Sequence, residues 1–247
     1  MGVFVISPFD KGGALYASSK KLRSLTLPDL DPMEFGALWL WQHALHSGEE
    51  GDAAIHTITI GVARPSDLDE PYFASLMVRN DAASALSKVR AVKDRLGKAF
   101  DDVHGGGWNY EWFKGLPTCY GSKTGVDFTQ YVWLYNLIKA YGMLFFAKAR
   151  YNTGKGNRSK WDDKLTYEEN MVKQDWGYMP GLAPVRGQDY RDVLRSSGVP
   201  EGQIERVCAI LDEVLDMLEG KAVVTDEESR DRKEIDLRPW TAFPEQP

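Results

Sequence analysis

The sequence has little of what builds disulfide frameworks, metal clusters or membrane spans. Its 247 residues include two cysteines, Cys119 and Cys208, which lie far apart in the chain. Two isolated cysteines suggest neither a disulfide framework nor a zinc site, and they favour a reducing compartment. The most apolar window, residues 131–146, is shorter than the roughly 20 residues of a membrane span, and it carries Asn136 and Lys139. We therefore expect a cytoplasmic protein that does not cross a membrane.

An excess of positive charge is also missing. The 30 lysines and arginines are outnumbered by 36 aspartates and glutamates, and the net charge is −6. Nucleic acids and anionic membranes attract concentrated positive charge, so neither is an expected partner. The first residues are apolar, but they lack the basic stretch and the length of a secretory signal.

What the sequence does contain is two short apolar segments, each followed by a turn and then by a helical pattern. Residues 2–6 form a continuous apolar run, which is typical of a strand buried on both faces of a parallel sheet. Residues 55–60 are rich in β-branched side chains, which favour a pleated strand. Because ligands bind at the carboxyl ends of parallel strands, the two turns that follow are the candidate site.

Helical patterns fill much of the remaining chain. Asp31, Pro32 and Glu34 combine an N-cap, a proline at the first helical position and a glutamate at the third, which predicts a helix start. A further helix is expected after Pro65, with acidic residues in its first turn. Other helices are expected over residues 82–103, about 128–151, 166–175 and 200–220, whereas 14–30 and 152–163 are expected to be irregular.

The chain is expected to divide where the sequence changes character. Residues 104–107 (His-Gly-Gly-Gly) interrupt a helical pattern, and aromatic, turn-rich sequence follows. We place the first domain at 1–104 and a mainly helical domain at 105–220. Residues 221–247 are charged and poor in apolar side chains, and we expect a disordered tail there.

The two strand–turn segments, taken in order, resemble the last two strand–loop units of an aldo/keto reductase barrel. Ser7-Pro8-Phe9 is similar to the turn whose serine and backbone face the cofactor pyrophosphate in that family. Gly61-Val-Ala-Arg-Pro65 is similar to the signature that receives the 2′-phosphate of NADP. The resemblance implies an α/β fold in which residues 1–104 form a partial (β/α)8 TIM-barrel segment, the last two βα units.

The resemblance also implies a function, that of an NAD(P)H-dependent oxidoreductase. The expected cofactor is NADP(H) or NAD(H). Asp67 stands where the family is often basic, which weakens a preference for NADP. The family's catalytic Tyr, Lys, Asp and His belong to strands that would precede Met1, so we expect no catalytic residue here and no turnover by this chain alone. The residues that the resemblance places on the cofactor are Ser7, Phe9, Lys11, Gly61, Ala63, Arg64 and Glu70.

The second half resembles the C-terminal ferredoxin-type domain that some members of this family carry. Gly125-Val-Asp-Phe128 and the aromatic segment 134–142 are similar to the start of that domain's long helix. The domain normally holds two iron–sulfur clusters, each bound by about four cysteine thiolates. Only Cys119 lies near the first cluster position, so we expect a helical, ferredoxin-like domain without an iron–sulfur cluster.

Other interpretations stay open beside this resemblance. The chain could be a non-catalytic scaffold or partner-binding subunit derived from such an enzyme, with a protein partner that supplies or covers the open barrel edge. It could also be two ordinary buried strands followed by an unrelated helical domain. His43 and His46 suggest a surface pair rather than a metal site, because no third ligand is evident. Cys119 has no identifiable histidine partner, which favours a plain thiol.

Overall fold

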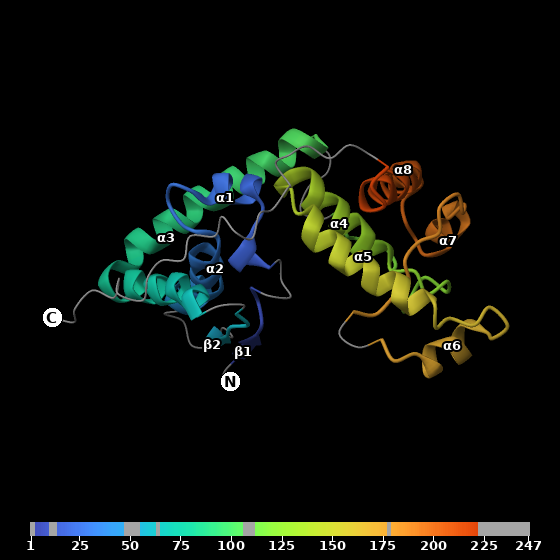
Figure 1. The fold of residues 1–247 in the computed structure, drawn as a ribbon. Helices are drawn as coiled ribbons and strands as arrows, with labels where there is room; N and C mark the ends of the chain where they lie inside the picture. Colours follow the sequence, from blue (N-terminus) through green and yellow to red (C-terminus); the bar gives the residue numbers. More distant parts are fainter. Residues whose placement is uncertain are drawn as a thin grey trace. The chain divides into compact units, whose positions relative to one another are not determined.

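The computed structural model describes residues 3–9, 14–46, 55–62, 65–105, 112–176 and 179–221. The fold is α/β and mostly helical, with one small parallel sheet (Figure 1). The chain divides into two compact units between Ala99 and Phe100, inside one long helix. This division lies slightly before the boundary that the sequence suggests after residue 104.

The first unit contains the sheet, whose strands are β1 (Val3–Ile6) and β2 (Ile55–Thr59). They pair in parallel, which is the arrangement that their apolar sequences indicate. One face of the sheet turns inward, where Ile58 packs on the core of the unit. The other face leaves Phe4 67% and Ile6 73% exposed. The sheet is therefore covered on one side only, although parallel strands are usually buried on both.

Local capping explains where the helices of this unit begin. As expected, α2 starts after Asp31: the Phe35 N–H donates to the Asp31 carbonyl (2.9 Å), and Glu34 accepts from the Asp31 N–H (2.8 Å). The expectation of irregular chain over 14–30 is wrong, because Ser19 caps a helix there by accepting from the Leu22 N–H (2.9 Å). The helices of the first unit are η1 (Leu15–Ala17), α1 (Lys20–Thr26), α2 (Pro32–His46), η2 (Pro65–Leu68) and most of α3 (Asp69–His104).

Helix α3 is broken at Asp81, whose backbone is extended (φ −156°, ψ 87°). The Asp81 carboxylate accepts the N–H of Ser84 (2.9 Å), so Asp81 is the N-cap of a second helical arm. That arm is the helix expected over 82–103. It ends at His104, where Gly105 adopts the left-handed conformation (φ 70°) that often closes a helix.

The core of the first unit joins the turn after β1 to α2 and to both arms of α3. Its side chains are mostly aliphatic, and Phe9 is its one fully buried aromatic ring among the described residues. The buried members are Phe9, Leu30, Met33, Ala37, Leu38, Ala74, Ala85, Val89 and Val92.

The second unit is a group of helices around a larger core. Helix α4 packs against both α5 and α8, and α7 packs against α8 (Figure 1). Aromatic rings supply much of the buried surface, among them Phe128, Tyr131 and Tyr151. The helices are α4 (Phe128–Tyr141), α5 (Leu144–Arg158), α6 (Tyr167–Lys173), α7 (Arg191–Ser196) and α8 (Glu201–Leu218).

The expected single helix over about 128–151 is instead two helices. Gly142 adopts a left-handed conformation (φ 66°), and its N–H bonds back to the Ile138 carbonyl (2.9 Å), which ends α4. The expected loop at 152–163 is wrong in its first part, because α5 continues to Arg158. Gly154 lies against Tyr131 in this part of α5, where any larger residue would not fit.

Two other helices agree well with expectation. Helix α6 begins with a complete capping box between Thr166 and Glu169, and α8 follows Pro200 and ends just before Gly220 (φ 74°). No helix in the described ranges is long and apolar enough to cross a membrane.

Candidate functional site

The candidate site is the end of the small sheet where both strands give way to turns. The Ser7 N–H donates to the Thr59 carbonyl (2.7 Å), directly after the paired positions Ile6 and Thr59. The turn that follows β1 and the turn that follows β2 at Gly61 therefore begin next to each other. Parallel pairing alone causes this, because it brings the carboxyl ends of both strands to one edge.

The turn after β1 is held in an unusual backbone conformation. Ser7 (φ 53°) and Ala14 (φ 49°) both have the left-handed conformation, which residues with a Cβ seldom adopt. The Leu15 N–H donates to the Phe9 carbonyl (2.7 Å) and ties the two sides of the turn together. Positions of this kind persist only where the surrounding structure fixes them, and they gather at ligand-binding loops.

Phe9 anchors this turn in the core of the unit. Its ring is 1% exposed and lies against Gly36 of α2, where an added Cβ would come within 2.7 Å of the Phe9 Cε1 atom. Glycine at 36 is thus what lets the ring lie against the helix. Phe9 was expected on the cofactor, and here its main contacts are structural.

Beside Phe9 is an apolar cavity of about 390 Å³. Pro8 and Phe9 line one part of it, and the rest is formed by residues of η1, α1 and α2. Trp39 is 41% exposed at this cavity and gives it an accessible aromatic wall. The volume and the apolar lining are typical of a small-molecule pocket.

Glu70 occupies a place that the sequence did not suggest. Its carboxylate accepts the N–H of Met33 (3.0 Å), one of the unpaired donors in the first turn of α2. Burial, together with the charges of Asp31 and Glu34, raises the pKa of Glu70 to about 7, against the lowering effect of the Met33 N–H. Glu70 therefore caps a helix of the core. No sequence pattern signals this, because the two groups are 37 residues apart.

The other predicted cofactor contacts lie partly beyond what the structure describes. Lys11, Ala63 and Arg64 are outside the described residues. Helix α2 includes His43 and His46, but their side chains are also outside the described part. Of the predicted set, the structure brings together Ser7, Phe9 and Gly61 at one end of the sheet, whereas the carboxylate of Glu70, in the first turn of α3, accepts a hydrogen bond from α2.

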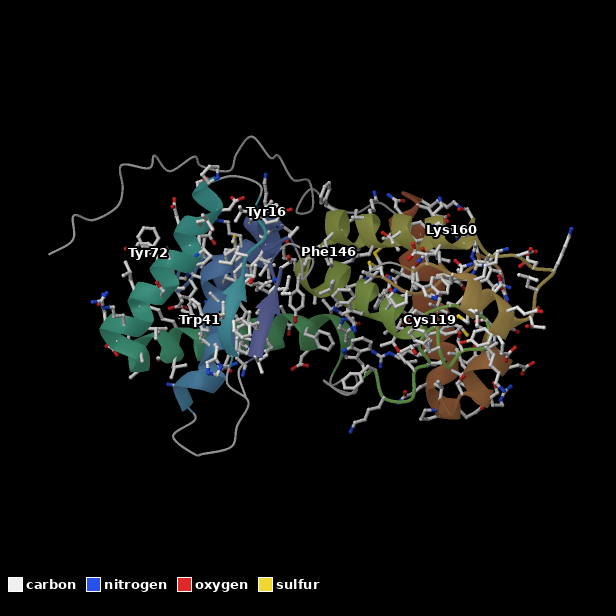
Figure 2. The ribbon with its side chains drawn as sticks, turned by 90° about the horizontal axis from the view of Figure 1, so that it is seen from below. Tyr16, Trp41, Tyr72, Cys119, Phe146 and Lys160 are labelled. Carbon is white, nitrogen blue, oxygen red and sulfur yellow. The ribbon has the colours of Figure 1, made fainter. Side chains whose placement is uncertain are left out.

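Cys119 is enclosed in the second unit (Figure 2), and it is a free, fully buried thiol. Burial, together with the negative charge of Asp127, raises the pKa of Cys119 to about 12. The thiol is thus protonated and a poor nucleophile, in agreement with the expectation of a plain thiol. Among the residues that the structure describes, no group of three or more His, Cys, Asp or Glu side chains is placed to hold a metal ion.

The two turn-rich stretches of the second unit lie side by side. The Leu182 N–H donates to the Gly125 carbonyl (2.8 Å), and Val126 and Leu182 form an isolated parallel bridge. Gly181 (φ 105°) faces Asp127 there, and an added Cβ would meet the Asp127 Cβ at 2.8 Å. The space between the stretches is filled by close backbone contact.

Comparison of the chain with family models, with curated proteins and with solved structures finds no match.

Proposed function

We propose that the chain is an aldo/keto-reductase-like protein whose first unit binds a nicotinamide dinucleotide at the carboxyl end of its sheet. The observation that carries this proposal is the parallel pairing of β1 and β2, in which the Ser7 N–H donates to the Thr59 carbonyl. A dinucleotide needs two adjacent turns, one for the pyrophosphate and one for the far end of the molecule. This edge of the sheet supplies both.

Three features of the edge support a phosphate ligand. Ser7 and Ala14, one on each side of the first turn, both have a left-handed backbone conformation, which loops that enclose phosphates often require. The helical segment formed by η2 and α3 begins at Pro65, after the second turn, and the partial positive charge of a helix start favours an anion there. Arg64 adds a cation to this turn in the sequence.

A fourth feature is the apolar cavity beside Pro8 and Phe9. A dinucleotide carries two flat rings as well as its phosphates, and a cavity of about 390 Å³ with Trp39 in its wall can hold one of them. The cofactor class is NADP(H) or NAD(H). The carboxylate of Asp67 opposes an additional 2′-phosphate, and the titration below distinguishes the two cofactors.

The test is a titration of the purified chain with NADPH and with NADH, followed by cofactor emission on excitation of tryptophan. We expect saturable binding and a loss of at least tenfold in affinity for Arg64→Ala. Arg79→Ala, an exposed arginine of α3, is the matched control and should bind like the original. Absence of binding at millimolar cofactor, or equal affinity in both variants, overturns the proposal.

A second candidate function is favoured by the uncovered face of the sheet. Phe4 and Ile6 are largely exposed there, although parallel strands are normally covered on both faces. In this alternative the chain is a non-catalytic subunit, and its partner is a protein that adds strands to the sheet and covers these two side chains. Failure of both cofactors to bind in the titration above supports this alternative.

We extend the proposal to the second unit as a ferredoxin-like domain without its clusters. The pairing of the two turn-rich stretches at Val126 and Leu182 supports it, because a two-cluster domain also brings two loops together. Two cysteines in the whole chain are too few for even one cluster of four thiolates. Iron analysis of the purified protein checks this, and stoichiometric iron would contradict it.

A further inference from the structure

Helix α2 supplies one wall of the cavity beside Phe9, through residues spaced three and four apart. This spacing places them on one face of the helix. The wall consists of Pro32, Phe35, Gly36, Trp39 and Leu40. It offers two aromatic rings and no charged group.

Helix α1 contributes the one hydroxyl group of the described lining, that of Thr26. This hydroxyl donates to the Arg23 carbonyl (3.1 Å). The Thr26 carbonyl accepts from the Leu30 N–H (3.2 Å) and from the Arg95 guanidinium (2.9 Å). The polar groups of Thr26 are therefore paired within the unit, and none of the described lining residues carries a charge.

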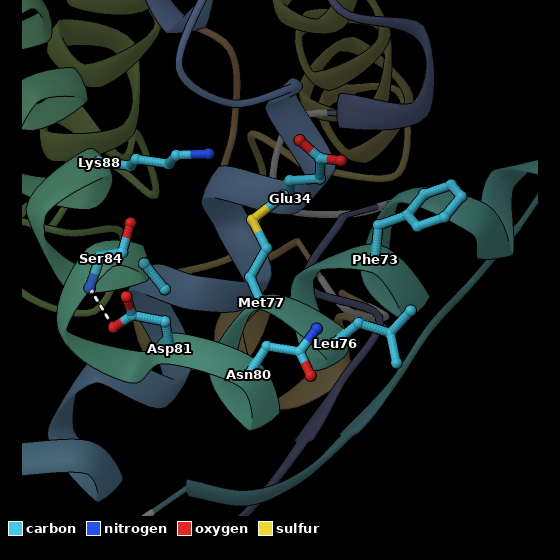
Figure 3. A pocket seen from close by; sticks show the side chains of 9 residues that line it. Glu34, Phe73, Leu76, Met77, Asn80, Asp81, Ser84 and Lys88 are labelled. Atoms are coloured by element: carbon cyan, nitrogen blue, oxygen red, sulfur yellow. Dashed lines mark hydrogen bonds between the residues drawn. The ribbon is translucent and has the colours of Figure 1, made fainter. Parts of the chain in front are cut away.

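The charged groups at the start of α2 are directed elsewhere. Glu34 lines the other cavity of this unit, which has a volume of about 460 Å³ and lies at the break of α3 (Figure 3). The Glu70 carboxylate bonds to the Met33 N–H (3.0 Å). Asp31 pairs with Arg23 (2.9 Å), so these two residues add no net charge. None of these groups lines the cavity beside Phe9.

Such a lining favours an uncharged ligand over a cation of the same shape. A cation that enters the cavity gives up hydration and meets no counter-ion among the described lining residues. The aromatic face of Trp39 attracts a cation, which acts against this preference. We expect the loss of hydration to dominate, because it concerns a whole unit charge whereas the ring offers only a quadrupole.

The two redox states of a nicotinamide ring differ in this property. The reduced dihydronicotinamide ring is uncharged, and the oxidised ring is a pyridinium cation. The cavity adjoins the first turn through Pro8 and Phe9, and none of its described lining residues belongs to the second turn or to α3. With the adenosine end of a dinucleotide at the second turn, the ring that reaches this cavity is the nicotinamide.

We propose that the cavity beside Phe9 selects the reduced nicotinamide ring, so that the chain binds NAD(P)H in preference to NAD(P)⁺. The preference between the two dinucleotides rests on the proposed function. The preference of the cavity for the uncharged ring does not, because it follows from the lining alone.

The first test is a calorimetric titration of the full chain with NADH and with NAD⁺. These two share their phosphates, riboses and adenine, so a difference in affinity reports on the nicotinamide ring. We expect NADH to bind at least tenfold more tightly. Equal affinity, or tighter binding of NAD⁺, overturns the proposal.

A second test separates this proposal from dinucleotide binding. The probes are 1-methyl-1,4-dihydronicotinamide, which is neutral, and 1-methylnicotinamide, which is its cationic counterpart, each followed by saturation-transfer NMR. We expect a signal for the neutral probe at millimolar concentration and a signal at least tenfold weaker for the cation. If neither dinucleotide binds but the neutral probe does, the proposed function fails and the selectivity of the cavity stands. Equal signals, or none for the neutral probe, overturn the selectivity.

Two variants at the exposed wall test where the ring lies. Trp39→Glu and Trp39→Gln both remove the indole, and they differ in one charge. The added carboxylate repels the phosphates of NADH and NAD⁺ alike, so the ratio of the two affinities isolates its effect on the ring. Trp39→Glu should shift this ratio at least fivefold towards NAD⁺ relative to Trp39→Gln. An identical ratio in the two variants, with circular dichroism showing both to be folded, contradicts the proposed place of the ring. The probe comparison on the original chain needs no variant and decides the selectivity if one does not fold.

Discussion

The two units of this chain are packed in different ways. The second unit fills its interior with aromatic rings, and backbone segments approach closely at Gly154 and Gly181. The first unit has a smaller, mostly aliphatic core, two cavities of about 460 and 390 Å³, and an apolar sheet face open to solvent. The second unit also has a pocket, of about 170 Å³, between the segment after Pro184 and α8. Cavities lower stability but offer binding space, and the larger of these three lie in the first unit.

The largest expected difference in stability between the two units comes from Gly154→Ala in the second unit. A Cβ there would overlap with the Tyr131 hydroxyl oxygen and come within 3.2 Å of the Ala183 backbone nitrogen, and Tyr131 is fully enclosed. We expect a loss of about 3 kcal/mol in the free energy of unfolding, measured with urea. Gly156→Ala is the matched control on α5, since its Cβ would meet nothing within 4 Å. It should stabilise by about 0.5–1 kcal/mol.

Tyr131→Phe extends this first test. The Tyr131 hydroxyl is buried without a hydrogen-bond partner among the described residues, so its removal should cost little. Combined with Gly154→Ala, it should recover a large part of the loss because it removes the overlapping oxygen. Full additivity of the two changes would show that the overlap is not the cause.

The next largest effect concerns Glu70 and pH. Its pKa is about 7 in the folded chain against an ordinary 4.5, so the folded state binds this proton more tightly than the unfolded state. The contribution of Glu70 to the free energy of unfolding is therefore fully present below pH 4.5 and is lost as the pH rises from 4.5 to about 7. The total loss is about 3 kcal/mol. Glu70→Gln keeps an oxygen for the Met33 N–H and removes the charge. It should be more stable than the original near pH 8 and similar to it at pH 4.5.

Urea midpoints at the two pH values measure this effect. Asp69→Asn, a change to the neighbouring carboxylate in the first turn of α3, is the control and should leave the pH dependence of the original chain in place. Parallel pH profiles for the original and for Glu70→Gln would assign the dependence to other groups.

The smallest expected effect is that of Gly36→Ala in the first unit. The new Cβ would come within 2.7 Å of Phe9, but the cavity beside that ring gives it space to move. We expect a loss of about 1 kcal/mol or less, because Ala also favours the helix. A loss as large as that of Gly154→Ala would mean that both units are packed equally tightly.

Much of the secondary structure was predictable because its signals are local. Asp31, Pro32 and Glu34 mark the start of α2, and Asp81 marks the start of the second arm of α3. Gly220 follows the end of α8. In each case the signal lies within four residues of the helix end. The errors arose where packing decides. The polar sequence after Tyr151 looked like a loop, yet it is helical as far as Arg158 and packs closely on Tyr131 through Gly154.

The candidate site was predictable in its location but not in its contacts. Two apolar strands with turns after them indicated one sheet edge, and the structure brings Ser7 and Gly61 to it. The sequence could not show that Phe9 turns into the core or that Glu70 caps α2. Both depend on which helix lies beside them, and no pattern within a few residues contains that information.

The sequence by itself determined the strands, most helix ends and the scarcity of thiolates. Strand propensity and helix capping act over a few residues, and composition does not depend on the fold. Only the tertiary structure decided that the Glu70 carboxylate caps α2, that a cavity lies at the break of α3, and that the described residues leave one face of the sheet open. These features require surfaces far apart in the chain to meet, and the fit between such surfaces is set by the whole packed unit.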